Sequence, residues 1–115
     1  ATCLFQVVAE DKAAAMEELA PYYHHVNNTY AEFMAEDKAI GMEDAKLAAM
    51  SLDDFKASGI LDIMTPEEAI VRFGKMKEKA PILEHVMLMR PPGLSADRFK
   101  AYAQVISDKV MPAFA

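Results

Sequence analysis

With 115 residues, of which 53% are apolar and 26% charged, the chain has the size and composition of one globular domain or of a piece of one, and not of a disordered protein. The net charge of −6 and the scattered lysines and arginines argue against a nucleic-acid partner, because a nucleic-acid-binding surface needs clustered cations. No apolar run is long enough for a transmembrane helix, no signal peptide is expected, and the single cysteine, Cys3, excludes an internal disulfide. We therefore expect a cytoplasmic protein with no membrane partner.

The first half of the chain predicts a strand, a long helix and then smaller helices. Residues 4–8 form a short apolar run, typical of a strand buried on both faces. Apolar side chains then recur every three or four residues along one stripe of a helix: Met16, Leu19, Tyr23, Val26, Tyr30 and Phe33. Pro21 lies inside this pattern and predicts a kink or a break. Residues 36–58 predict an insertion of small helices, with Ser51 as a cap and Gly59 as a stop.

Two further strand–helix units are predicted in the second half. Residues 60–64 indicate a strand, and Thr65-Pro66-Glu67-Glu68 then begins a helix because it offers a cap, a proline for the first turn and a glutamate that can reach back. Residues 82–89 indicate a third, almost wholly apolar strand, and Pro91-Pro92-Gly93 forces a turn. Ser95 is expected to cap a last helix, which Pro112 ends.

Apolar strands alternating with helices predict an α/β fold with a parallel sheet. We expect about three parallel βα units that form part of a (β/α) barrel of the TIM type. Three strands cannot close a barrel, and their apolar edges would be exposed. The expected partner is therefore the remainder of the barrel or another copy of the chain, so a homo-oligomer is predicted.

Few residues suggest catalysis. His24 and His25 are adjacent and point about 100° apart on a helix, so they cannot hold a metal as an i, i+4 pair can, and we interpret them as surface residues. Glu84 and His85 begin the third strand, the end away from the active face of a barrel, where a structural role is favoured. Glu67 and Glu68 are a candidate acid/base pair, but acids are also common in the first turn of a helix. No metal-ligand cluster, phosphate loop or nucleophile motif is present.

The most suggestive residues lie around the end of the third predicted strand. Arg90 directly follows that strand, at the end where parallel α/β folds place their active sites. A solvated arginine at a strand end is the equally weighted alternative. Met87 and Met89, with Met64 on another strand, are candidates to line a flavin or hydrocarbon pocket, although methionine is also a flexible core filler.

Three segments together resemble the luciferase-like flavin-dependent monooxygenases. They are the strand-to-helix turn ILDIMTPEEAIVRF, the segment ILEHVMLMRPPGL and the terminal VMPAF. The N-terminal strand followed by AEDKAAAMEEL is also similar to a later strand–helix unit of that family. The resemblance covers nearly the whole chain, although residues 36–58 match poorly. Met64 stands where the family usually has a small residue, which argues against a close approach of flavin phosphate to this turn.

The resemblance implies that residues 1–115 are the C-terminal portion of an eight-stranded α/β barrel. Such an enzyme uses reduced flavin, usually FMN, and O2 to oxygenate a small organic substrate, and the cofactor carries the oxidation chemistry. A complete barrel needs about 250 residues, so we expect the isolated chain to lack much of the flavin site and to be inactive. Arg90 and Met89 are the candidate cofactor-binding residues, and no catalytic residue is assigned.

Two other functions remain open. The chain could be a non-catalytic α/β module that associates through open sheet edges. It could also be a compact oxygenase or binding protein with a dimeric α+β barrel, but the absence of hairpin signals such as Asn-Gly between strands counts against that reading.

Overall fold

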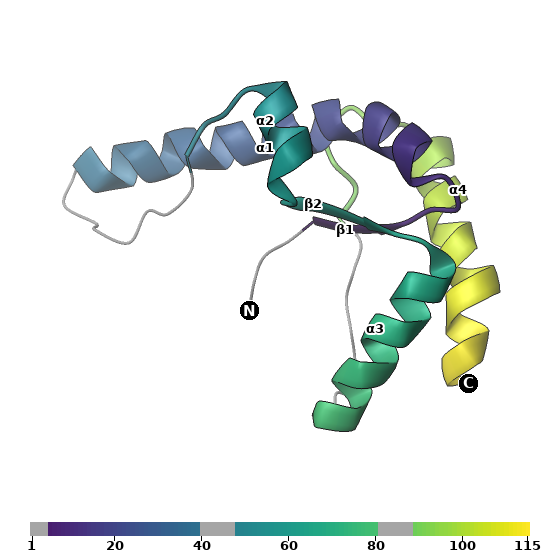
Figure 1. Ribbon diagram of the computed structural model, residues 1–115. Helices are drawn as coiled ribbons and strands as arrows, with labels where there is room; N and C mark the ends of the chain where they lie inside the picture. The colour runs from purple at the N-terminus through teal and green to yellow at the C-terminus, as the bar shows by residue number, and fades with distance from the viewer. Residues whose placement is uncertain (1–4, 40–47, 81–88) are drawn as a thin grey trace.

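The computed structural model describes residues 5–39, 48–80 and 89–115, and it is mostly helical, at 71% (Figure 1). Two short strands and four α-helices are followed by a wider and then a tighter helical turn at the C-terminus. In chain order the elements are β1 (Phe5–Val8), α1 (Lys12–Ala39), α2 (Leu52–Ser58), β2 (Leu61–Met64), α3 (Pro66–Lys79), α4 (Ala96–Val105), the π-helix η1 (Ile106–Val110) and the 3₁₀-helix η2 (Met111–Phe114).

The two strands form a parallel pair. Phe5 lies opposite Leu61 and Val8 opposite Met64, so the strands are in register over their whole length. A parallel pair requires a crossover connection, which α1 and α2 supply. The predicted strands at residues 4–8 and 60–64 and their parallel pairing are therefore confirmed within the described residues 5–8 and 61–64.

Side chains from the two faces of this sheet enter two separate hydrophobic clusters. Val7 and Ile63 belong to the first cluster, which includes Leu19 and Tyr23 of α1 and Phe55 of α2. Val8 and Met64, the next residues along, belong to the second cluster, with residues of α3 and of the C-terminal helical segment. Because successive strand residues point to opposite faces, helical residues cover both faces of the sheet at its carboxyl end.

The predicted partial barrel of the TIM type is wrong. The described part of the chain has one sheet of two parallel strands and four α-helices, and it does not contain three βα units. The third predicted strand, residues 82–89, lies outside the described residues except for Met89, which is not in a strand. A barrel keeps its helices on the outer side of the sheet, whereas here α3 and η1 contribute to the cluster around Val8 and Met64. The apolar face that would have lined a barrel is buried by the chain's own helices.

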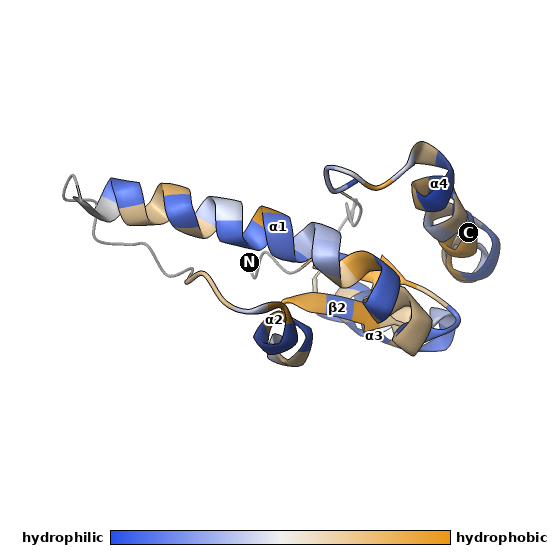
Figure 2. Ribbon diagram, turned by 90° about the horizontal axis from the view of Figure 1, so that it is seen from above, coloured by the Kyte–Doolittle hydropathy of each residue, from blue (hydrophilic) through white to orange (hydrophobic). Residues whose placement is uncertain are grey.

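Only part of helix α1 packs against the other described elements. It continues through Pro21 as one helix, so the predicted break into two helices does not occur. Leu19, Tyr23 and Val26 of the predicted stripe are buried, but Tyr30 and Phe33 are about half exposed. Figures 1 and 2 show why, since the second half of α1 extends beyond the other described elements. No helix in the described ranges has the length and apolar character needed to cross a membrane.

The predicted helix boundaries are confirmed where side chains cap them. Ser51, Thr65 and Ser95 each accept a hydrogen bond from the backbone amide three residues later. Gly59 ends α2 with a φ of 77°, a left-handed conformation that favours glycine. The last helix loses α geometry at Ile106, before the predicted end at Pro112, and Pro112 itself lies inside η2.

Candidate functional site

The carboxyl end of the sheet is the candidate functional site. In parallel α/β folds ligands bind beyond this edge, where the following helices begin. Here β1 leads to the start of α1 and β2 to the start of α3. The side chain of Asp11 accepts a hydrogen bond from the amide of Ala14 at 3.0 Å, and Thr65 caps α3. The two helix starts are thus fixed side by side at one edge.

Glu68 connects these two helix starts. Its carboxylate accepts a hydrogen bond from the backbone amide of Thr65 at 2.9 Å, which completes a capping box, and forms an ion pair with Lys12 at 2.9 Å. The bond from Lys12, and then that from Thr65, lower the pKa of Glu68. A carboxylate held in its ionised form is a poor general acid near neutral pH. The structural interpretation of Glu68 as a helix-start acid is confirmed by this geometry.

A charged cluster joins α1 to α4 next to this edge. Arg98 donates to Glu18 through Nε at 2.6 Å and through Nη2 at 2.7 Å, and the Tyr102 hydroxyl donates to the same carboxylate at 3.0 Å. The bonds from Arg98 lower the pKa of Glu18, and the carboxylate raises the pKa of Arg98. Burial, followed by the bond to Glu18, raises the pKa of Tyr102. Sequence reasoning missed this cluster because its members are 80 and 84 positions apart and match no local motif.

Two surface hollows flank the edge. One, of about 260 Å³, lies between α1 and α4 beside the Glu18–Arg98–Tyr102 cluster. The other, of about 510 Å³, is lined by Lys12, Glu67, Glu68, Val71, Arg72 and Lys75. Neither lining contains a histidine, cysteine or serine, and three of the five acids in the two linings, Glu10, Glu18 and Glu68, form ion pairs. Both hollows are lined by charged side chains of both signs, which suits the binding of a charged group.

The structure places Arg90 and Met89 at the opposite end of β1. The hydroxyl of Tyr23 donates to the carbonyl of Met89 at 2.9 Å, and the Tyr23 ring stacks on Phe5, the first residue of β1. Arg90 is exposed, and its Nε donates to the carbonyl of Leu94 at 2.9 Å. The two candidate cofactor-binding residues are thus together on one loop against the middle of α1. Met64, the third candidate for a flavin pocket, is buried in the second cluster and is not at this loop.

His24 and His25, which are adjacent on α1, differ in their burial. His25 is exposed, as predicted, but His24 is half buried and its Nε2 lies 2.7 Å from the carbonyl of Met50, so the prediction for His24 is wrong. Asn28, one turn along α1, exchanges two hydrogen bonds with the backbone of Met50. His24 therefore helps to anchor the segment before α2. The candidates Glu84, His85 and Met87, like Cys3, lie outside the described residues.

The described residues contain no group of three or more histidine, cysteine, aspartate or glutamate side chains placed to hold a metal ion. Comparisons with protein-family models, with curated proteins and with solved structures found no match, so the residues and their geometry carry the functional argument.

Proposed function

We propose that this chain is the C-terminal part of a flavin-dependent monooxygenase that uses reduced FMN and O2 on a small organic substrate. The observation that supports this proposal most is the local structure of the segment ILDIMTPEEAIVRF. It forms strand β2, a Thr65 cap with a reciprocal bond from Glu68, and helix α3 with Pro66 in its first turn. The segment that carries the family resemblance therefore has the strand-to-helix conformation that the resemblance implies.

The described residues fit a flavin phosphate better at Arg90 than at the start of α3. Glu67 and Glu68 occupy the first turn of α3, where their negative charges would repel a phosphate. Arg90 is exposed and oriented by its bond to Leu94, and arginine has five N–H donors in a fork that matches phosphate or carboxylate oxygens. In the proposed enzyme Arg90 and Met89 contact the cofactor or the substrate, and the bound flavin supplies the oxidation chemistry.

Titration of flavin fluorescence tests this proposal in two proteins, the full native gene product and the 115-residue chain. We expect Arg90→Ala in a full-length parent to weaken flavin or substrate binding by about 1–3 kcal/mol, the scale for losing a hydrogen bond to a charged group. Lys100→Ala, on the exposed side of α4, is the matched control and should leave binding unchanged. A native product no longer than this chain, or micromolar flavin binding by the isolated chain, would contradict the proposed fragment.

The second candidate function is a non-catalytic module that works by association. The observation that favours it is the size of the sheet in the described part of the chain, because two paired strands of four residues give little independent stability. An intact mass for the native product separates the two candidates, since a parent much longer than this chain agrees with the enzyme. A native product of this length that associates and binds no flavin would favour the module.

A further inference from the structure

The part of α1 that extends beyond the core has an aromatic and acidic surface, which we call the distal α1 surface (Tyr30, Phe33, Glu36 and Asp37). Tyr30 and Phe33 are 51% and 55% exposed, and their rings pack edge to face at 6.5 Å. Glu36 and Asp37 are exposed and form no ion pair with the side chains that the structure describes. Large apolar rings next to unpaired charge are typical of a contact surface.

Two physical effects add to the negative potential of this surface. From Thr29 to Lys38 the sequence has three acidic residues, Glu32, Glu36 and Asp37, and one basic residue, Lys38, so its net charge is negative. Glu36 and Asp37 also lie in the last turns of α1, where the helix dipole is itself negative and acids are unfavourable. A positively charged partner would offset both the repulsion among the acids and their repulsion by the helix dipole. We therefore expect the partner to present basic side chains next to an exposed apolar side chain.

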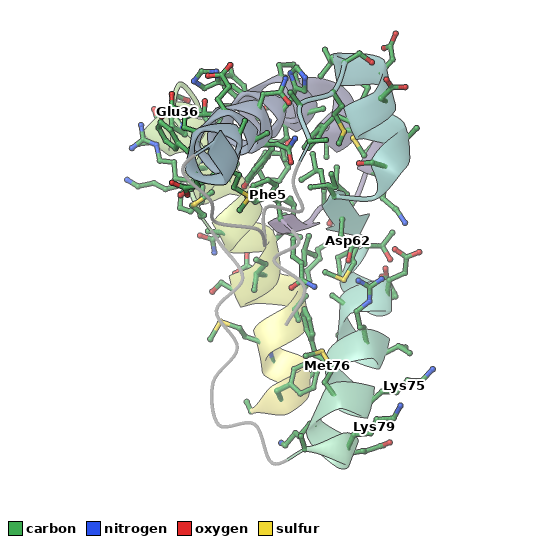
Figure 3. All side chains as sticks on the ribbon, turned by 90° about the vertical axis from the view of Figure 1, so that its left-hand side faces the viewer. Phe5, Glu36, Asp62, Lys75, Met76 and Lys79 are labelled. Carbon is green, nitrogen blue, oxygen red and sulfur yellow. The ribbon has the colours of Figure 1, made fainter. Side chains whose placement is uncertain are left out.

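Helix α3 has such a surface, which we call the α3 surface (Val71, Lys75 and Lys79). Val71 is 56% exposed and, with Lys75, lines the hollow of about 510 Å³. Residues 72 to 79 contain four cations and one acid, and Lys75 and Lys79 form no ion pair within the described ranges. Figure 3 shows Lys75 and Lys79 projecting from the same side of α3, away from the rest of the chain.

We propose that the distal α1 surface of one copy of this chain binds the α3 surface of a second copy. The spacing agrees as well as the charge, because Phe33 to Asp37 and Val71 to Lys75 are each four residues, or about 6 Å along a helix. With the two helices packed in parallel, the aromatic pair covers Val71 while Asp37 lies opposite Lys75. The two surfaces lie at different ends of the molecule, so they meet between copies rather than within one (Figures 1 and 3).

The contact is heterologous, since it joins two different surfaces. After one contact has formed, one copy still has a free α3 surface and the other a free distal α1 surface, so association continues from head to tail instead of stopping at a symmetric dimer. This inference does not depend on the flavin proposal, because neither surface includes Met89 or Arg90.

A mixing experiment tests the heterologous contact. Phe33→Ser disables the distal α1 surface and keeps the α3 surface, and Lys75→Glu does the reverse. In sedimentation up to about 1 mM, the range of weak contacts, we expect the unmodified chain to grow in mass with concentration and each variant alone to remain monomeric. An equimolar mixture should form a dimer and nothing larger, because only one productive pair of surfaces remains.

Charge reversal supplies the control. Lys100→Glu makes the same change in net charge as Lys75→Glu but lies on α4, and it should associate as the unmodified chain does. Asp37→Lys combined with Lys75→Asp should restore at least part of the association lost in either single variant. Circular dichroism shows that each variant is folded. The proposal is overturned by a monomeric unmodified chain, by a mixture of the two variants that stays monomeric, or by either variant alone associating as strongly as the unmodified chain.

Discussion

Gly93 is the residue whose replacement the backbone opposes most directly. Its φ of 91° lies in the region that favours glycine, in a turn closed by a bond from the Leu94 amide to the Pro91 carbonyl, and an added Cβ would lie 3.2 Å from the ring of Tyr22. We expect Gly93→Ala to lower the free energy of unfolding by about 1–3 kcal/mol. Gly74→Ala is the control, since its Cβ enters open space inside α3 and should stabilise by about 0.5–1 kcal/mol. Urea denaturation measures the unfolding free energy of both variants. Equal effects would contradict the conclusion that the backbone at position 93 requires glycine.

Tyr23 gives the protein a measurable dependence on alkaline pH. Its side chain is buried, and burial raises its pKa to about 12 from the ordinary value of 10.0. Between these two values the unfolded chain has released the proton and the folded chain retains it, so stability falls as pH rises. The unfolding free energy of the unmodified chain minus that of Tyr23→Phe should therefore fall by about 2 kcal/mol from pH 10 to pH 12. A difference that stays constant over this window would contradict the burial of an un-ionised Tyr23.

At the scale of elements, the cluster of Glu18, Arg98 and Tyr102 fixes α4 against α1. The bonds from Arg98 lower the pKa of Glu18, so its stabilisation is complete above the unfolded value of 4.5 and is lost as pH falls through the folded pKa. We expect Glu18→Gln to cost about 1–3 kcal/mol near neutral pH and much less at about pH 3. The neighbouring Glu17→Gln breaks only an exposed pair with Lys56, and should cost about 0–1 kcal/mol. Thermal unfolding at both pH values checks the prediction, which fails if the two variants behave alike.

Local elements could be predicted from the sequence because their signals are local. Thr65 and Glu68 are three residues apart, so the capping box could be identified before any tertiary contact was known. The same holds for Ser95 at the start of α4. The exposure of Tyr30 and Phe33 could not be predicted in this way, because periodicity shows which side chains share a stripe but not where the packing partner ends. Pro21 is a second case in which the local signal was misleading. The proline predicts a break, but Leu19 and Tyr23 on either side of it are buried and the helix continues through it.

For the whole molecule, the prediction of a partial barrel failed because the alternation of strands and helices along the chain does not determine which face of the sheet each helix covers. The parallel pairing of β1 and β2 was predictable, but the packing of α3 and the C-terminal helical segment around Val8 and Met64 was not. The candidate site shows the same limit. Its helix-start acids are visible in the sequence, whereas the contact of Arg98 with Glu18 exists only because α4 lies beside α1.

Stability should be distributed unevenly along α1, and hydrogen exchange can measure this. The first half of α1 contributes Ala15, Leu19, Ala20 and Tyr23 to the cluster that contains the sheet, Phe55 and Tyr102, whereas Tyr30 and Phe33 of the second half are about half exposed. Amides with few buried contacts exchange through local opening, and those of the core exchange only through larger unfolding. At a concentration where the chain is monomeric, we expect the amides of residues 17–26 to exchange at least about tenfold more slowly than those of residues 32–38. Uniform protection along the whole of α1 would show that the distal half is stabilised independently of the core, and the division of the helix at Tyr30 would be wrong.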